Sequence, residues 1–218
     1  MISAADQDYI KAIYKLQQAV GDVPTSSLAA ALGVTAASVS GMLKKLSQAR
    51  LVTHRHYRGV RLTEKGRHSA LEVLRRHRLI ELFLVEILGM QWDSVHQEAE
   101  KLEHAVSDAV LARMDEVLGF PERDPHGSSI PSPEGQPAGK RGIRLDQVPA
   151  GRNGIVCEVS DEDPDMLRHL SKIGLVPGTK VSVSEVLTID GTIMIRCGKR
   201  KHGISPKVAT AVWINGDE

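Results

Sequence analysis

Apolar positions near the start of the chain recur at helical spacing. The S-A-A-D run that begins at Ser3 is typical of a helix N-terminus, and Ile10, Ile13 and Tyr14 continue one apolar face. The sequence therefore predicts a first helix from Ser3 to about Val20.

Two shorter helical segments and an alternating segment follow. Thr25 begins a helix that Gly33 ends, and a three-residue step leads into a helix over residues 37–50. A helix, a tight turn with glycine and a second helix match a helix-turn-helix. Residues 51–63 alternate like two strands around R-H-Y-R-G, which predicts a wing. The alternative, an αα-hairpin with a solvated basic face, leaves the wing unexplained.

A winged helix-turn-helix predicts DNA binding. The start of its recognition helix presents small polar side chains to base edges, while Lys and Arg contact phosphates. The predicted base contacts are the hydroxyls of Thr35, Ser38 and Ser40. The predicted phosphate contacts are Lys44, Lys45 and Arg50 on the helix and Arg55, Arg58 and Arg61 on the wing.

The next helical pattern begins at Thr63 and extends to about Gly89, with one apolar face. His77 and Glu81 stand in the middle of that face, one turn apart. A carboxylate in an apolar stripe needs a partner, and a His–Glu pair at this spacing is suited to bind a metal ion. A buried His–Glu hydrogen bond explains this pair about equally well.

Residues 93–110 read as one further helix. At roughly 100° per residue, their polar side chains His96, Glu100, Glu103 and His104 share an arc of about 100° beside the stripe that should be buried. Two carboxylates and two imidazoles at the edge of a core lose solvation unless a cation compensates them. The group therefore favours a divalent metal over a solvated polar face with satisfied histidines.

The remainder of the chain differs in composition and in its pattern of apolar residues. Residues 121–142 are rich in Pro and Gly without a period, which is typical of an irregular linker. Strand-like runs, a T-I-D-G-T turn and one short helix then predict a small β-barrel of about five strands over residues 143–218. Four acids gather at the start of its helix, where capping is favoured over metal ligation: Asp161, Glu162, Asp163 and Asp165.

Composition and charge fit two or three small domains. Of 218 residues 41% are hydrophobic, and there is neither a membrane-spanning apolar run nor a signal peptide, which indicates a cytoplasmic protein. Cys157 and Cys197 should be reduced core thiols. Residues 41–78 carry eleven Lys and Arg against two acids, while residues 79–124 carry three against eleven. This asymmetry indicates one region for phosphate and another for cations.

These motifs resemble the diphtheria toxin repressor family of metal-dependent transcriptional regulators, and within it the manganese-transport regulators. The resembling runs are D-Y-I-K-A-I-Y, the helix-turn-helix, Y-R-G-V-R-L-T-E-K-G, R-R-H-R-L-I-E and V-H-Q-E-A-E-K-L-E-H-A-V-S-D. In the tail, L-S-K-I-G-L-V-P-G-T-K-V is similar to the SH3-like domain of some members.

The implied fold is α+β and multidomain. It comprises a winged helix-turn-helix DNA-binding domain (1–64), a helical metal-binding and dimerisation domain (65–120), the linker (121–142) and an SH3-like β-barrel (143–218).

The resemblance also implies two metal sites. The family's regulatory site, between the first helix and the dimerisation helices, corresponds to Asp8, Glu100, Glu103 and His104. Its ancillary site corresponds to His77, Glu81 and His96, with Asp163 or alternatively Asp165 supplied by the SH3-like domain. Helical spacing alone would leave Asp8 solvent-exposed, so that assignment depends on the resemblance.

Three positions depart from family patterns. Lys11 stands where manganese regulators commonly have a second acidic ligand, which argues against a two-manganese cluster. Gly41 and Glu100 stand where iron-type members have Gln and Cys. A carboxylate in place of a thiolate makes a harder site, so Mn²⁺ is favoured over Fe²⁺ as the effector.

The expected function is therefore that of a homodimeric, metal-activated repressor that binds a palindromic double-stranded operator and represses metal-uptake genes. It would be no enzyme and have neither a membrane partner nor a small-molecule substrate. The alternative of a winged-helix repressor that responds to a small organic ligand would leave the His/Glu clusters unexplained. A di-metal carboxylate protein is disfavoured because its repeated Glu-x-x-His motif is absent.

Overall fold

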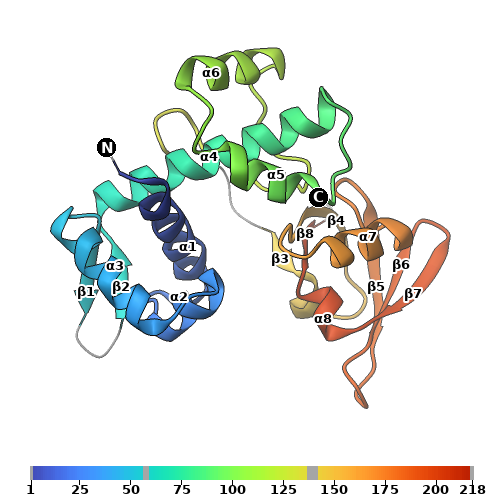
Figure 1. Cartoon of the computed structure of the whole chain (residues 1–218). Coiled ribbons are helices and arrows are strands. Elements are labelled where there is room, and N and C mark those ends of the chain that lie inside the picture. The colour runs from blue at the N-terminus through green and yellow to red at the C-terminus, as the bar shows by residue number, and fades with distance from the viewer. Residues whose placement is uncertain (1, 56–58, 137–141, 217–218) are drawn as a thin grey trace. The chain divides into compact units, whose positions relative to one another are not determined.

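The computed structural model describes residues 2–55, 59–136 and 142–216. The chain forms two compact units, one of residues 1–76 with 131–137 and the other of residues 77–130 with 138–218. Helix α4 (Glu64–Glu86) continues from the first unit into the second (Figure 1).

The N-terminal unit is a winged helix-turn-helix. It consists of α1 (Ala4–Val20), α2 (Thr25–Leu32), α3 (Ala36–Gln48), strands β1 (Val52–Arg55) and β2 (Gly59–Leu62), and the beginning of α4. The predicted start of α1 is confirmed, because Ser3 forms a reciprocal capping box with Asp6. The α2–α3 turn is also confirmed, with Gly33 in the left-handed conformation and Thr35 capping α3.

The two wing strands are antiparallel, with Val52 opposite Leu62. Gly59 is required at the base of the wing, since its φ is +112° and an added Cβ would lie 2.3 Å from the Val23 carbonyl oxygen. Val23 and Val60 exchange backbone hydrogen bonds of 2.9 Å there. The wing is thereby attached to the segment between α1 and α2.

In the described part of the chain, no single helix is long and apolar enough to span a membrane. Only α2 and α3 taken together reach that length and composition, with a bend of 107° between them.

The helices of the second unit differ from the sequence prediction. Residues 93–110 are not one helix: α5 (Val95–Leu102) ends, and α6 (Asp108–Val117) begins after a break. The cause is local, because the Ser107 side chain accepts a hydrogen bond from the Val110 amide and caps a new helix. Ser94, the residue before α5, forms no side-chain cap, and its hydroxyl donates to the Gln91 carbonyl.

The segment after α6 contains no helix or strand up to residue 130, within the described residues, but it is tightly bound to its unit. Arg78 donates to the Ser129 carbonyl at 2.5 Å, and the Val159 amide donates to the His126 carbonyl at 2.9 Å. Gly127 has φ +85°, and a Cβ there would lie 2.1 Å from the Cys157 carbonyl oxygen. The predicted linker therefore places several polar side chains inside the molecule.

The C-terminal domain is a six-stranded antiparallel sheet in the order β3-β8-β4-β5-β6-β7, where about five strands were predicted. Its elements are β3 (Ile143–Arg144), η1 (Leu145–Gln147), β4 (Asn153–Val159), α7 (Pro164–Ile173), β5 (Lys180–Val186), β6 (Ile193–Cys197), β7 (Arg200–Ile204), α8 (Pro206–Ala209) and β8 (Val212–Gly216).

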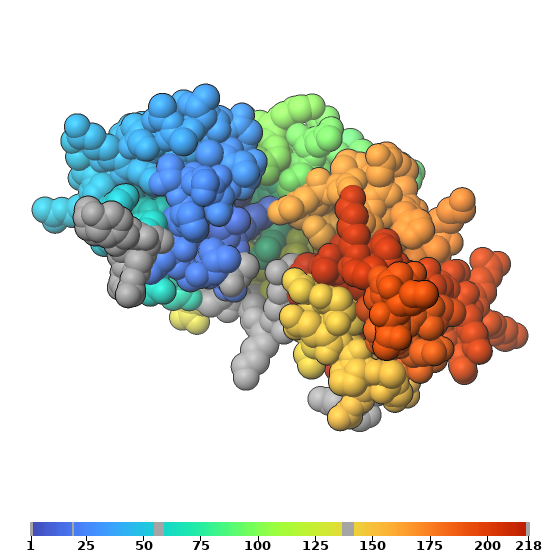
Figure 2. All heavy atoms as spheres, turned by 90° about the horizontal axis from the view of Figure 1, so that it is seen from below, coloured from blue at the N-terminus to red at the C-terminus, as the bar shows by residue number. Residues whose placement is uncertain are grey.

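The predicted helix and the hairpin turn before β6 are confirmed, whereas β3 and β7 gave too short or too polar a pattern to be recognised. The strand-like pattern of the last run, residues 208–214, includes Val208 and Ala209, but these two residues belong to α8. A core of sixteen buried residues fills this domain, whose surface is yellow to red in Figure 2.

Candidate metal centre

The start of α3 exposes the three predicted base-contacting hydroxyls, but the helix already uses two of them. Thr35 Oγ1 accepts from the Ser38 amide at 3.2 Å, and Ser40 Oγ donates to the Ala36 carbonyl at 2.9 Å. Lys44 is exposed on the same helix. Arg58 lies outside the described residues, as does the side chain of Arg55.

Two of the predicted phosphate contacts have acidic partners within the N-terminal unit. Lys45 Nζ donates to both carboxylate oxygens of Asp6, at 2.7 and 2.9 Å, and Arg61 Nε lies 2.6 Å from Asp22 Oδ1. Burial would raise the pKa of Asp6, but hydrogen bonds from Lys45 and Ser3 lower it overall. Lys45 therefore links α3 to the first turn of α1.

His77 lies between the two predicted groups of metal ligands. Its Nδ1 is 2.5 Å from Glu103 Oε2 and 3.8 Å from Glu100 Oε1, while its Nε2 is 3.0 Å from Glu81 Oε1. The His77, Glu81 and Glu103 side chains are at most 2% exposed. The imidazole was predicted as an ancillary ligand, but it contacts carboxylates of both groups.

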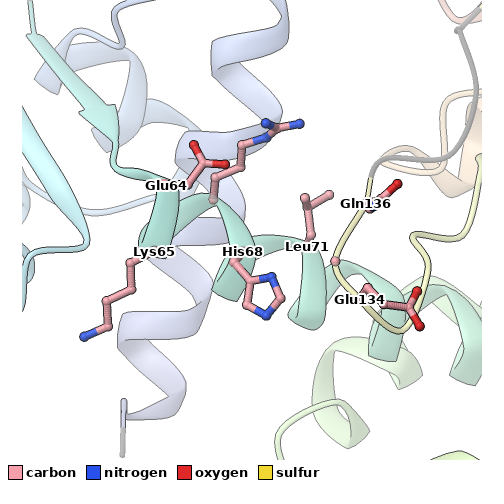
Figure 3. A pocket seen from close by; sticks show the side chains of 8 residues that line it. Glu64, Lys65, His68, Leu71, Glu134 and Gln136 are labelled. Atoms are coloured by element: carbon pink, nitrogen blue, oxygen red, sulfur yellow. The ribbon is translucent and has the colours of Figure 1, made fainter.

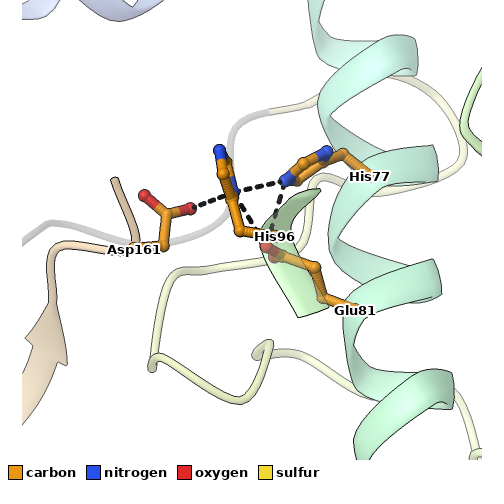
Figure 4. A group of neighbouring side chains, drawn as sticks. All are labelled: His77, Glu81, His96 and Asp161. Atoms are coloured by element: carbon orange, nitrogen blue, oxygen red, sulfur yellow. Dashed lines mark hydrogen bonds and ion pairs between the residues drawn. The ribbon is translucent and has the colours of Figure 1, made fainter. Parts of the chain in front are cut away.

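A compact group forms around Glu81 on α4 (Figure 4). His96 Nδ1 lies 3.1 Å from Glu81 Oε1 and 3.4 Å from Asp161 Oδ2, and one ligand atom from each of these residues and His77 falls within 4.8 Å of the others. In Figure 4, Asp161 approaches His96 from the side opposite α4.

Charge coupling within this group shifts two pKa values strongly. Burial would raise the pKa of Glu81, but His77 and His96 lower it to about 2. Burial would lower the pKa of His96, but Asp161 and Glu81 raise it to about 10. A cation is therefore strongly favoured between these carboxylates, whether it is a proton on the imidazole or a metal ion.

The acidic side chain that the C-terminal domain brings to His96 is Asp161 and not the predicted Asp163. Asp163 Oδ1 accepts from the amides of Asp165 and Met166 at 3.0 and 3.2 Å, so it caps α7. The sequence indicated an acidic run before this helix. Only the tertiary structure distinguishes Asp163, which caps α7, from Asp161, which faces His96.

Asp124 and His126, which sequence reasoning missed, form a third group with Glu81. One ligand atom of each lies within 4.8 Å of the others, and all three residues are buried. Within the described structure, Glu81 Oε2, Asp124 Oδ2 and His126 Nδ1 have no hydrogen-bond partner. His126 Nδ1 lies 3.9 Å from Glu81 Oε2.

The tautomer of His126 is fixed by the backbone. Its Nε2 lies 2.8 Å from the Trp92 carbonyl oxygen, which can only accept, so Nε2 carries the hydrogen. In the neutral ring, Nδ1 therefore presents a lone pair towards Glu81, as a metal-ligating histidine with an outer-shell carbonyl partner does. Burial and the Glu81 charge raise the pKa of Asp124 well above its usual range. Asp124 Oδ2 also lies 3.5 Å from Arg78 Nε, and the buried oxygen and nitrogen atoms around Glu81 fit a divalent cation.

The predicted regulatory residues are only partly brought together within the second unit. Glu103 contacts His77, and its Oε1 lies 3.4 Å from His104 Nε2. Glu100 is also near His77, and His77, Glu100 and Glu103 form a further potential metal-binding group. Asp8 stands on α1 in the N-terminal unit, and its membership of this site remains a prediction.

A separate open hollow lies in the N-terminal unit beside the first turns of α4 (Figure 3). It is lined by Glu64, Lys65, Arg67, His68, Leu71 and Glu134–Gln136. None of the predicted metal or DNA residues contributes to it, and its mixture of opposite charges indicates no particular ligand.

Three family models match successive parts of the chain. Residues 1–60 match the N-terminal DNA-binding domain of iron-dependent repressors, residues 63–132 match the metal-binding and dimerisation domain of the same proteins, and residues 143–215 match the FeoA domain.

Complete proteins and solved structures are similar along nearly the whole chain. The iron-dependent repressor IdeR of Mycobacterium tuberculosis is 32% identical over 218 residues, with 94% of each chain covered. The diphtheria toxin repressor of Corynebacterium glutamicum is 32% identical over 188 residues, covering 80% of this chain and 81% of the other. Among solved structures, a manganese-dependent transcriptional repressor in complex with manganese is 40% identical, with a TM-score of 0.92 and 97% and 100% coverage.

A structure of ScaR with bound Cd²⁺ is 28% identical, with a TM-score of 0.87 over 97% of this chain and 99% of the other. Domain order, full-length similarity and the buried His/Glu groups agree with one another. The chain belongs to the diphtheria toxin repressor family of metal-dependent, DNA-binding transcriptional repressors.

Proposed function

We propose that this repressor responds to manganese, with Fe²⁺ as the alternative effector. The observation that supports Mn²⁺ most directly is the donor chemistry of the buried groups, which offer carboxylate oxygens and imidazole nitrogens and no thiolate among the described residues. The similar structure with the TM-score of 0.92 is a manganese-dependent repressor. Several similar curated proteins are named iron-dependent, which keeps Fe²⁺ as the competing effector.

We assign two metal-binding groups. The regulatory group is Asp8, Glu100, Glu103 and His104. The second group is His77, Glu81, His96 and Asp161, in which Asp161 takes the role first predicted for Asp163, and Asp124 and His126 adjoin this group through Glu81. A bound divalent metal would neutralise these buried carboxylates. His77 then acts as a shared neighbour, because its Nδ1 faces Glu103 and its Nε2 faces Glu81.

Asp161 connects the second metal-binding group to the C-terminal SH3-like domain. It belongs to the C-terminal SH3-like domain, while Glu81 and His96 belong to helices α4 and α5. A ligand set drawn from both requires that domain to remain docked on the helices. Metal occupancy and the position of the SH3-like domain are therefore coupled, and each should stabilise the other.

The dimer forms through the helical part of the second unit. Large apolar side chains are exposed just after α4, on α6 and just after α6, including Leu88 at 58%, Val110 at 49% and Phe120 at 70%. Apolar side chains left at a surface in this number favour burial against another copy. A two-fold dimer places two recognition helices on a palindromic operator, with half-sites one helical turn or a multiple apart.

The genes under control are those for metal uptake, which a metal-activated repressor switches off when the metal is plentiful. The deciding experiment selects genomic fragments with chelator-stripped protein, with and without Mn²⁺, followed by sequencing and fluorescence anisotropy. Palindromic fragments recovered only with Mn²⁺ support the proposal. Recovery that is equal in both conditions contradicts it, and recovery with Fe²⁺ alone would assign the effector to iron.

A further inference from the structure

One face of the C-terminal sheet carries a concentration of positive charge that the metal sites do not require. In β5 and β6, Val181, Val183, Ile195 and Cys197 point into the core and are at most 8% exposed. Side chains alternate along strands, so Lys180, Ser182 and Arg196 belong to the opposite, outer face.

The strand register gathers these side chains into one row. Asn153 on β4 is opposite Ser182 on β5, Ser182 is opposite Arg196 on β6, and Arg196 is opposite Lys201 on β7. Lys180 lies one step closer to the β6–β7 turn, which itself contains Lys199. We call Lys180, Arg196, Lys199 and Lys201 the basic sheet face. All four are exposed, and none forms an ion pair with an acid in the described part of the chain.

This arrangement is unfavourable for the isolated domain. Arg196 and Lys201 are direct cross-strand neighbours, and side chains in such positions lie about 5 Å apart at Cβ, where like charges repel. One acid, Glu185, stands on the outer face of β5 opposite Met194, and it forms no ion pair with Arg196 or Lys201 within the described residues. The other acids of the domain lie elsewhere, with Asp161 to Asp165 gathered before and within α7. The cross-strand pair of Arg196 and Lys201 therefore has no carboxylate bound to it.

Protection of a sheet edge explains only part of the pattern. β7 is an edge strand, and Lys or Arg on such a strand discourages pairing with another chain. Arg196, however, lies on the second strand from the edge and Lys180 on the third. Cations that continue inward on one face of a sheet fit a polyanion lying across it.

We propose that the basic sheet face is an additional DNA-backbone contact, made by the SH3-like domain independently of the recognition helices. The chemistry recognised is a series of phosphates, which Lys and Arg side chains contact without reading sequence. Ser182 and Asn153 supply neutral hydrogen-bond donors in the same row. The domain thereby increases affinity on all duplexes while leaving operator preference to the N-terminal unit.

The test compares two full-length double variants that lose the same charge. Arg196→Gln with Lys201→Gln removes the cross-strand pair, and Lys172→Gln with Lys207→Gln removes two exposed cations elsewhere in the domain. Binding of Mn²⁺-loaded protein to a fluorescein-labelled duplex of random sequence is measured by anisotropy at several salt concentrations. Because this probe needs no known operator, the result does not depend on the proposed target genes.

Each phosphate contact contributes about 0.9 to the magnitude of the slope of log K against log salt. The loss of two cations in the first variant should therefore reduce the magnitude of this slope by up to about 2. The control should retain the wild-type slope. The melting temperature of the first variant should equal or exceed that of the wild type, since repulsion is removed. An unchanged slope, or an equal loss in both variants, overturns the proposal. So does loss of binding to phosphatidylglycerol vesicles with an unchanged duplex slope, which would assign the face to lipid.

Discussion

Nδ1 of His77 lies 2.5 Å from Oε2 of Glu103, and Nε2 of the same ring lies 3.0 Å from Oε1 of Glu81. One buried imidazole therefore contacts a carboxylate of each proposed metal group. Its loss should disturb both groups together, unlike the loss of a residue that belongs to only one of them.

His77→Ala should lower the affinity for Mn²⁺ by about 10- to 100-fold, because both carboxylates lose the neighbour that orients them. Isothermal titration calorimetry of chelator-stripped protein measures this loss. His68→Ala is the matched control, since His68 stands on the same helix with its side chain 51% exposed. Equal affinities for the two variants would contradict the role of His77.

Asp161 and Asp163 should have separable effects. Asp161→Ala should weaken Mn²⁺ binding and leave the folding of the C-terminal domain intact, because its carboxylate faces His96. Asp163→Ala should leave Mn²⁺ affinity unchanged and lower the free energy of unfolding by about 1 kcal/mol through loss of the α7 cap. Calorimetric titration and thermal unfolding of both variants give the comparison, and the reverse pattern would restore the original sequence prediction.

Neighbouring lysines on the recognition helix should differ in their response to salt. Lys44→Ala should reduce the slope of log K against log salt by about 0.9, as expected for one phosphate contact. Lys45→Ala should change that slope much less, because Lys45 Nζ donates to both oxygens of Asp6. If Lys45→Ala gives the larger change, its ion pair with Asp6 does not persist on DNA.

The metal-free protein should be most stable in weakly acidic solution. The pKa of His96 is raised from 6.5 to about 10, so its stabilising contribution is complete below pH 6.5 and is lost as the pH rises towards 10. The pKa of Glu81 is lowered from 4.5 to about 2, so its contribution is complete above pH 4.5 and is lost as the pH falls towards 2. Denaturant unfolding between pH 4 and 10 should therefore show a decline at each end, and His96→Gln should flatten the alkaline one.

Replacing Glu100 should change the metal preference. Glu100→Cys introduces a soft thiolate, so affinity for Fe²⁺ and Zn²⁺ should rise relative to Mn²⁺. Competition between these ions, measured with anaerobic protein, gives the ratio. Glu98→Cys, on the same helix but outside the metal-binding groups, is the control and should leave the ratio unchanged.

Helix boundaries were predictable where the sequence contains local capping or helix-ending residues. Ser3, Gly33 and Thr35 cap or end α1, α2 and α3 through contacts with residues three or four positions away. The break between α5 and α6 was missed because the apolar period continues through it, while the Ser107 cap interrupts the backbone. Periodicity predicts which face is buried but not whether the helix is continuous.

The candidate site was predictable only where its residues share a helix. His77 and Glu81 could be paired from spacing alone, since both lie on α4. Asp124 and His126 could not, because their segment has no period and its burial arises from contacts with β4 and α4. The choice between Asp161 and Asp163 depends on backbone geometry before α7, which the acidic run does not reveal.

The loop that contains Asp124 restricts where insertions and deletions can occur in related repressors. Asp124 Oδ1 accepts from the amides of His126 and Ser128, both at 2.9 Å, which fixes the spacing of these three residues. An insertion or deletion here would alter the loop and displace His126 from Glu81 at the same time. Length variation among related repressors should therefore be excluded from residues 124–128, even though their composition resembles that of a freely variable linker.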